Sequence, residues 1–323
     1  AGYQVTISQG TGANVVIPNG GIKMLVTDGA GAGAAVTDVL DMTGGTSNVG
    51  LGSGSLGTAI TTGTENTAIG ADSLDAVTTG AYNVAVGKDA LTDQTTGNYN
   101  VAVGRRAGYD ITTGSENVAI GYLSLYAATT ASNNIAIGTS ALQANTSGTD
   151  NVAVGDRAGT AITTGSNNTA IGDVALTANT TGAGNTAIGA DSLDANTTGD
   201  SNVAIGKSAL TANTTANTNV AIGAAAMEAN TTGANNVAVG AVALDANTTA
   251  SNNTALGYAA LGANTTGTPN TAVGYQAATA NTTGENIVAV GYQALASNTT
   301  GVSNTAVGYG ALDANTTANS NTA

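Results

Sequence analysis

Few side chains of this sequence are suited to acid–base, nucleophilic or metal chemistry. The 323 residues contain no His and no Cys, and Asp and Glu together number 20. A general base with a tuned pKa and a thiolate metal site therefore have no obvious residues. No G-x-S-x-G motif and no phosphate-binding loop occurs. We expect no enzymatic activity, no metal and no cofactor.

The tripeptide Asn-Thr-Thr matches the acceptor motif for N-glycosylation. It recurs at one fixed place, at Asn179, Asn196, Asn213, Asn230, Asn247, Asn264, Asn281, Asn298 and Asn315, with Asn145-Thr146-Ser147 as a near copy. Earlier copies keep the Thr pair but carry Val77, Gln94, Ile111, Ala128 or Ile162 instead of Asn. Stacked Asn and Thr side chains bond to each other and to turn backbone. We therefore interpret the motif as a structural ladder, and glycosylation stays the alternative.

Tyr258, Tyr275, Tyr292 and Tyr309 recur at one constant spacing and would form an exposed aromatic stripe, with Tyr122 at the same position further back. Such a stripe is a candidate surface for binding sugars or a host surface. Tyrosine also packs over a neighbouring turn at the edge of a repeat. We favour packing as the main role of these four residues.

Charged residues are few, and we predict that they lie on the surface of the protein. Acidic residues scatter over several positions and lack the G-x-D spacing of calcium-loaded β-rolls; they include Asp72, Asp173, Asp191, Asp194, Asp245 and Asp313. We expect them to form a solvated face. The basic cluster consists of Lys88, Arg105, Arg106 and Arg157, with Asp89, Asp110 and Asp156 as expected ion-pair partners.

A repeat of constant length organises most of the chain. The motif N-[TVI]-A-[IVL]-G begins at Asn66, Asn83 and Asn100 and continues at this spacing of 17 positions up to Asn304. Ile replaces the Asn at 287, and the motif begins again at Asn321. Its third residue is always Ala, and its fifth is always Gly. Because an inserted residue would break the stacking of a turn with both neighbours, this constant spacing predicts a solenoid.

Short β-strands suit this repeat better than helices. A helical repeat needs about 33 residues, and helices tolerate Gly and Thr-Thr poorly. We expect two short strands and two turns per repeat. One strand is Thr67-Ala68-Ile69, and the other lies in A-L-x-A-N-T-T, where Leu176, Leu193 and Leu210 supply core residues. The candidate structural ladder comprises Asn66, Ala68, Gly70, Asn185, Ala187, Gly189, Asn202, Ala204 and Gly206.

The composition predicts a thin core and association with further chains. The sequence has no Phe or Trp and only 3 Met, so Ala, Val, Ile and Leu must form the core. We expect each turn to bury few large apolar side chains. The stabilisation from this burial is small compared with the conformational entropy lost when the residues of a turn become ordered. The invariant Ala implies a close approach on its face of the strand. We therefore expect another chain to pack against that face.

The N-x-A-[IV]-G turns resemble the left-handed β-roll in the head of trimeric autotransporter adhesins of the YadA type. The longer unit, as in NTAVGYQAATANTTGEN at 270–286, is similar to repeat arrays of phage tail-fibre proteins. The resemblance covers residues 66–323. It implies a homotrimer in which left-handed parallel β-rolls pack around a threefold axis. Because the chain stops inside a repeat at Asn321-Thr322-Ala323, we expect it to be incomplete at its C-terminus.

Residues 1–47 lie outside the repeat and form a predicted β-rich cap or attachment segment. YQVTISQ and ANVVIPNGGIKMLVTDG alternate in a β manner, with PNGG as a hairpin candidate. Residues 48–65 are expected to be a transitional turn, because Asn48-Val49-Gly50-Leu51-Gly52 is an imperfect copy of the motif that begins 18 positions before Asn66. Residues 66–323 then form the β-roll array.

Three functions fit this pattern. The net charge of −14 argues against nucleic acid as a partner, and the lack of a long apolar run argues against membrane insertion. The favoured function is the trimeric shaft of a viral tail or capsid fibre, joined to other virion proteins through residues 1–47 and supporting attachment to a host glycan or protein. The alternatives are a surface adhesin head of a bacterium and an extracellular filament subunit that polymerises end to end.

Overall fold

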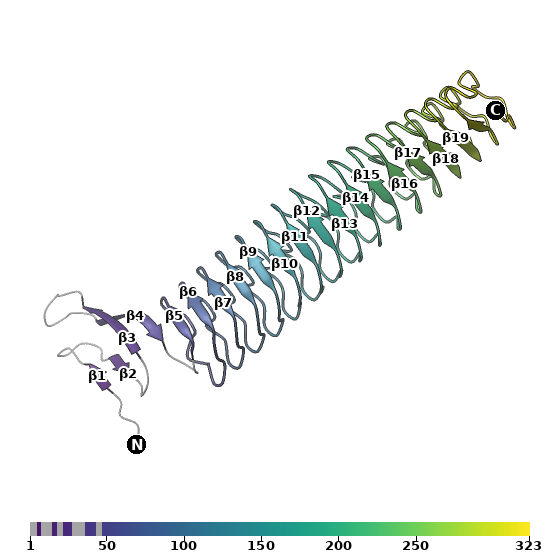
Figure 1. Ribbon diagram of the computed structural model, residues 1–323. Coiled ribbons are helices and arrows are strands. Elements are labelled where there is room, and N and C mark those ends of the chain that lie inside the picture. The colour runs from purple at the N-terminus through teal and green to yellow at the C-terminus, as the bar shows by residue number, and fades with distance from the viewer. Residues whose placement is uncertain (1–4, 8–14, 18–21, 28–35, 43–46) are drawn as a thin grey trace. The chain divides into compact units, whose positions relative to one another are not determined.

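The computed structural model describes residues 5–7, 15–17, 22–27, 36–42 and 47–323, with side chains from residue 47 onward. The chain divides into two compact units, residues Ala1–Ser147 and Gly148–Ala323, here called unit 1 and unit 2. All regular secondary structure in the described residues is β. Figure 1 shows that in each unit the chain winds in successive coils of similar size.

The first strands of unit 1 are antiparallel. β1 (Val5–Ile7) pairs with β2 (Val15–Ile17), and β3 (Ile22–Thr27) pairs with β4 (Val36–Met42). β4 reaches the repeats through one antiparallel pair, Asp41 with Gly50. The candidate PNGG turn, residues 18–21, lies outside the described residues.

The rest of unit 1 is a parallel sheet with one strand per coil. Its strands are β5 (Val49–Leu51), β6 (Thr67–Ile69), β7 (Val84–Val86), β8 (Val101–Val103), β9 (Val118–Ile120) and β10 (Ile135–Ile137). From β6 onward each strand pairs with the equivalent residues one repeat away. The imperfect first copy joins the same sheet, because Gly50 lies opposite Ala68 in the β5–β6 pair.

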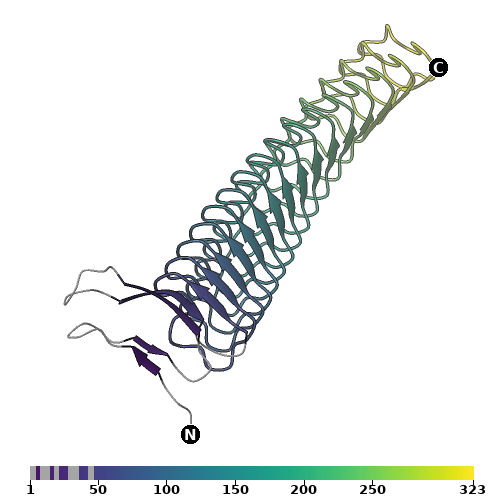
Figure 2. The ribbon, with the colours of Figure 1, turned by 60° about the vertical axis from the view of Figure 1, so that its left-hand side comes forward.

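Unit 2 repeats this arrangement. Its strands are β11 (Val152–Val154), β12 (Thr169–Ile171), β13 (Thr186–Ile188), β14 (Val203–Ile205), β15 (Val220–Ile222), β16 (Val237–Val239), β17 (Thr254–Leu256), β18 (Asn270–Val273), β19 (Ile287–Val290) and β20 (Thr305–Val307). Ala187 lies opposite Ala204, and the register holds through β20. Figure 2 shows the strands of each unit in a row along one side of the coils. The predicted all-β solenoid, with turns of one repeat each, is confirmed.

The second strand predicted for each turn is wrong. After the Gly that follows each strand, the backbone takes left-handed conformations at the seventh and ninth positions of the repeat, as at Asp191 (φ 56°) and Leu193 (φ 51°). A strand requires negative φ throughout, so the A-L-x-A-N-T-T segment bends instead of extending. It still bonds from coil to coil, because the Leu193 N–H donates to the Ala209 carbonyl at 3.0 Å and the Thr197 N–H to the Thr214 carbonyl at 2.8 Å.

The orientation of the strand side chains also corrects the prediction. Ala204 has no exposed surface, and it faces the interior of its own coil. Val203 and Ile205, on either side of it, are only half-buried. The close approach that the invariant Ala indicated is therefore with other parts of the same coil, and the larger apolar residues lie on the outer face of the sheet.

The core of each coil is narrow. Where the large side chain at the ninth position of the repeat is missing, a large side chain at the twelfth position can fill its space. Leucine fills the ninth position of most repeats and is buried, as at Leu91 and Leu176. Gly replaces this leucine in two coils, at Gly108 and Gly159, and a buried isoleucine follows three positions later in each, Ile111 and Ile162. A Cβ atom on Gly108 would lie 3.0 Å from Ile111 Cδ1 and 2.9 Å from Leu91 Cδ2. The isoleucine therefore occupies the space that a leucine would need, as close packing requires.

We predict that Ala204→Leu destabilises the coil itself. The added atoms have no space in a closely packed interior, and overpacking costs about 1–3 kcal/mol. Thr198→Leu, at an exposed residue away from the strand, is the matched control, and a surface change of this kind alters stability by less than about 0.5 kcal/mol. Thermal unfolding of both variants followed by circular dichroism measures the difference. An unchanged melting temperature for Ala204→Leu would contradict the inward orientation.

Candidate functional site

The Asn that opens each repeat forms a buried ladder along the coils. The Asn185 Oδ1 atom accepts hydrogen bonds from the backbone N–H of Asn202 at 3.0 Å and from its Nδ2 at 3.2 Å. Asn202 Nδ2 also donates to the Ala216 carbonyl at 2.8 Å. Asn66 makes the same contacts in unit 1, to the Asn83 N–H and the Gly80 carbonyl. Such an amide joins neighbouring coils and fixes the corner of its own coil. Asn253 is an exception, because its Nδ2 is buried without a hydrogen-bond partner.

One repeat interrupts this ladder. Ile287 stands where the other repeats have Asn, and its side chain is buried. Its backbone N–H still donates to Asn270 Oδ1 at 3.0 Å. An isoleucine side chain has no oxygen to accept from the N–H of Asn304 in the next coil. Apolar burial replaces the hydrogen bonds at this one position.

The Asn of the Asn-Thr-Thr motif forms a second internal ladder. Asn196 Nδ2 donates to Asn179 Oδ1 at 3.0 Å and to the Gly199 carbonyl at 3.0 Å. Asn179 and Asn196 have no exposed surface, so the folded coil leaves no room for a glycan on them. The first Thr of the motif continues the bonding, because Thr197 Oγ1 donates to the Thr214 carbonyl at 3.1 Å.

The fifth-position glycines are required both by backbone conformation and by space. Gly70, Gly189 and Gly206 have φ values of 131°, 133° and 134°, which side-chain-bearing residues rarely adopt. A Cβ atom on Gly189 would lie 2.6 Å from the Gly206 carbonyl oxygen of the next coil. No other residue fits where the strand ends and the chain turns.

We predict the stability order wild type, then Asn202→Ile, then Asn202→Ala. Both variants leave the Asn219 N–H and the Ala216 carbonyl without the amide that they contact at 3.0 and 2.8 Å. Each buried group left without a partner costs about 1–3 kcal/mol. Isoleucine fills the volume, as Ile287 does naturally, whereas alanine also leaves a cavity. Thermal unfolding measures the order, and a melting temperature for Asn202→Ala equal to the wild type would rule out a stabilising ladder.

The four tyrosines that share the sixth position stack on one another and stay exposed. Ring centroids are 5.3 Å apart for Tyr258–Tyr275, and 5.2 Å apart for both Tyr275–Tyr292 and Tyr292–Tyr309, with planes within 14° of parallel. Their exposed fractions range from 43% for Tyr292 to 83% for Tyr309. The rings therefore both pack over the neighbouring turn and face solvent.

Two further tyrosine pairs were missed by the sequence analysis. Tyr82 stacks on Tyr99 at 4.9 Å, and Tyr109 stacks on Tyr126 at 5.3 Å. The members of each pair are one repeat apart in the chain, so the repeat length itself was the available signal. Tyr122 instead lies beneath the Arg105 guanidinium, whose Cζ is 5.9 Å from the ring centroid.

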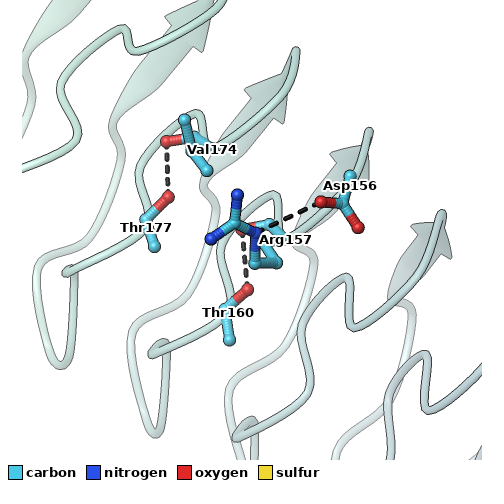
Figure 3. A network of polar contacts seen from close by, with 5 residues as sticks. All are labelled: Asp156, Arg157, Thr160, Val174 and Thr177. Atoms are coloured by element: carbon cyan, nitrogen blue, oxygen red, sulfur yellow. Dashed lines mark hydrogen bonds and ion pairs between the residues drawn. The ribbon is translucent and has the colours of Figure 1, made fainter.

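The basic residues make surface contacts with two of the three expected acidic partners. Arg106 Nε lies 3.5 Å from Asp89 Oδ2 across neighbouring coils, and Arg157 Nε lies 3.2 Å from Asp156 Oδ2 (Figure 3). Both arginines are substantially exposed, so each pair is worth about 0–1 kcal/mol. Asp110 differs from these, because burial and the nearby charge of Asp93 raise the pKa of its carboxyl group.

Threonines at the tenth position cap the left-handed corner of the coil. Thr160 Oγ1 donates to the Arg157 carbonyl of its own coil at 2.7 Å. In the following coil, Thr177 Oγ1 makes the equivalent bond to the Val174 carbonyl (Figure 3). Arg157 and Val174 have positive φ values of 52° and 49°. Asp194 occupies the same repeat position but carries no proton to donate when ionised.

Asp194 is poorly placed for a charge. Burial raises the pKa of its carboxyl group, partly offset by backbone N–H bonds, and its Oδ1 is buried without a hydrogen-bond partner. Its folded-state pKa therefore lies above the unfolded value. As pH rises, the carboxyl group loses its proton first in the unfolded chain. The free energy of unfolding therefore falls over the pH range between the ordinary pKa of 3.8 and the raised pKa of the folded chain.

We predict that Asp194→Thr raises stability at pH 7 by about 1 kcal/mol, the net value of one hydrogen bond. The gain shrinks as pH falls towards about 3, where the wild-type carboxyl is protonated in both states. Thr177→Asp is the reciprocal control, which loses a donor and becomes less stable at pH 7. Melting temperatures across this pH range provide the measurement. A gain for Asp194→Thr that does not change with pH would rule out ionisation as its cause.

Searches for other sites and for known relatives gave no match. Among the described residues no group of three or more His, Cys, Asp or Glu is arranged to hold a metal ion. No helix in the described part of the chain is long and apolar enough to cross a bilayer. No family model, no curated protein and no solved structure matches this chain.

Proposed function

We propose that this protein is the rigid shaft of a viral fibre, of a phage tail or a capsid, and that three copies associate to form it. In this proposal the rolls are left-handed and pack around a threefold axis. The fibre holds an attachment tip away from the virion, and residues 1–47 join it to other virion proteins. The observation that carries the proposal is the apolar outer face of the parallel sheet.

This outer face consists of the second and fourth residues of the repeat. All of them are Thr, Val, Ile or Leu, and none is charged. The most exposed of them are Ile69, Val103, Ile120, Ile135 and Ile137 in unit 1, and Ile171, Ile222, Val237, Leu256, Val288 and Val307 in unit 2. Parallel sheets normally have both faces covered, and extended apolar patches mark interaction surfaces. Here the inner face is covered by the coil and the outer face is open.

Further copies of this chain are the occupant that suits the face best. The face recurs once per repeat in each unit, and another copy in register carries a surface with the same repeat. A threefold arrangement lets each copy cover part of both others. The coils repeat one structural unit. In this proposal the protein therefore acts through its length and stiffness, as a spacer between the virion and the attachment tip.

The mass of the purified chain in solution tests this proposal. Light scattering should give three times 30.8 kDa. The double variant Ile205→Lys, Ile222→Lys places two charges on the outer face and should give single chains that keep the β-rich circular dichroism spectrum. Thr198→Lys, an exposed residue away from the strand, is the matched control and should stay trimeric. A wild-type mass of one chain, or an unchanged mass for the double variant, would overturn the interface.

A further inference from the structure

Eight of the described tyrosines stand in columns whose neighbouring members stack, each one coil beyond the last. The longest column, here called the tyrosine ladder, is Tyr258, Tyr275, Tyr292 and Tyr309, with ring centroids 5.2–5.3 Å apart. Each inner ring has a tyrosine on both faces. What the inner rings offer to solvent is therefore their edges and hydroxyl groups, and their faces, which would stack on a sugar, are occupied.

The stacked phenols are readily accessible to an oxidant. Every ring of the tyrosine ladder is at least 43% exposed. The sequence contains no Trp and no Cys, the other side chains that readily give up single electrons, and only 3 Met. One of these, Met227, has no exposed surface. Oxidising equivalents that reach this part of the chain therefore go to tyrosine.

We propose that the tyrosine ladder is a site of oxidative cross-linking, at which neighbouring rings join as dityrosine in the presence of hydrogen peroxide and a haem peroxidase. Each phenol gives one electron and its hydroxyl proton to the oxidised haem. The two phenoxyl radicals form a carbon–carbon bond between ring carbons adjacent to the hydroxyl-bearing carbons. Each of these carbons then releases its hydrogen as a proton that returns to the phenolic oxygen. The pair loses two hydrogen atoms, and one peroxide becomes two waters.

Coupling within the ladder is favoured because the two radicals need not diffuse together. The fold holds each ring against its partner with planes 7–14° apart, which raises their effective concentration. Each new bond closes a loop one repeat long and ties one coil to the next. Such a loop restricts the unfolded chain, as a disulfide of the same span does. Cross-linking should therefore raise the melting temperature.

The test treats the full chain with peroxide and a plant haem peroxidase, followed by digestion and mass spectrometry. Light and heavy isotope-labelled chains are mixed beforehand to separate bonds within a chain from bonds between chains. We expect links of 258 to 275, 275 to 292 and 292 to 309 within single chains, together with a higher melting temperature. Tyr122, exposed at the same repeat position without a tyrosine partner, is the internal control and should stay unlinked.

The double variant Tyr275→Phe, Tyr292→Phe is the matched control for the ladder. It keeps the stacked rings but separates the remaining phenols Tyr258 and Tyr309, so all three links should disappear and the gain in melting temperature should be smaller than in the wild type. The Tyr82–Tyr99 pair, stacked at 4.9 Å in unit 1, should link in both proteins and shows that the peroxidase is active. Ladder tyrosines that are oxidised but unlinked, or links that mix light and heavy chains at random, would overturn the proposal.

Discussion

Hydrogen bonding between equivalent residues of neighbouring repeats is the constraint on which this structure depends. Strand pairs, corner carbonyls and both Asn ladders all bond to the matching residue of a neighbouring coil or to the residue beside it. A coil with one residue more or fewer would lose its partners on both sides. The unvarying repeat length from Asn66 onward follows directly from this requirement. The nearly invariant Asn and invariant Gly follow from it as well, because their neighbours leave no space for alternatives.

The repeat length and the strand position could be predicted from sequence because both follow from simple rules. A short, constant period with a β-type motif has few structural solutions, and β6 to β20 lie where the motif places them. The ladder formed by the Asn that opens each repeat could also be predicted, because a constant spacing places identical side chains above one another in neighbouring coils. The structure supplies its bonding pattern, in which Asn202 contacts the preceding coil and its own corner.

The direction of the side chains could not be predicted, because it depends on backbone conformations that residue types do not indicate. Leu193 and Asp191 take left-handed conformations, which bulky and charged residues usually avoid. These conformations turn the chain so that leucine points inward and the second predicted strand does not form. They also place Ala204 inside the coil and leave Ile205 outside. The surface proposed to meet further copies is therefore the aliphatic face and not the alanine face.

The isoleucine at position 287 gives the Asn ladder of unit 2 one plane without an Asn side chain. On one side its backbone N–H is bonded to Asn270, and on the other its side chain has no oxygen for Asn304. Apolar contacts yield gradually when surfaces slide, whereas aligned hydrogen bonds rupture together and depend steeply on geometry. A lateral load on unit 2 therefore meets different resistance at this plane than at its neighbours.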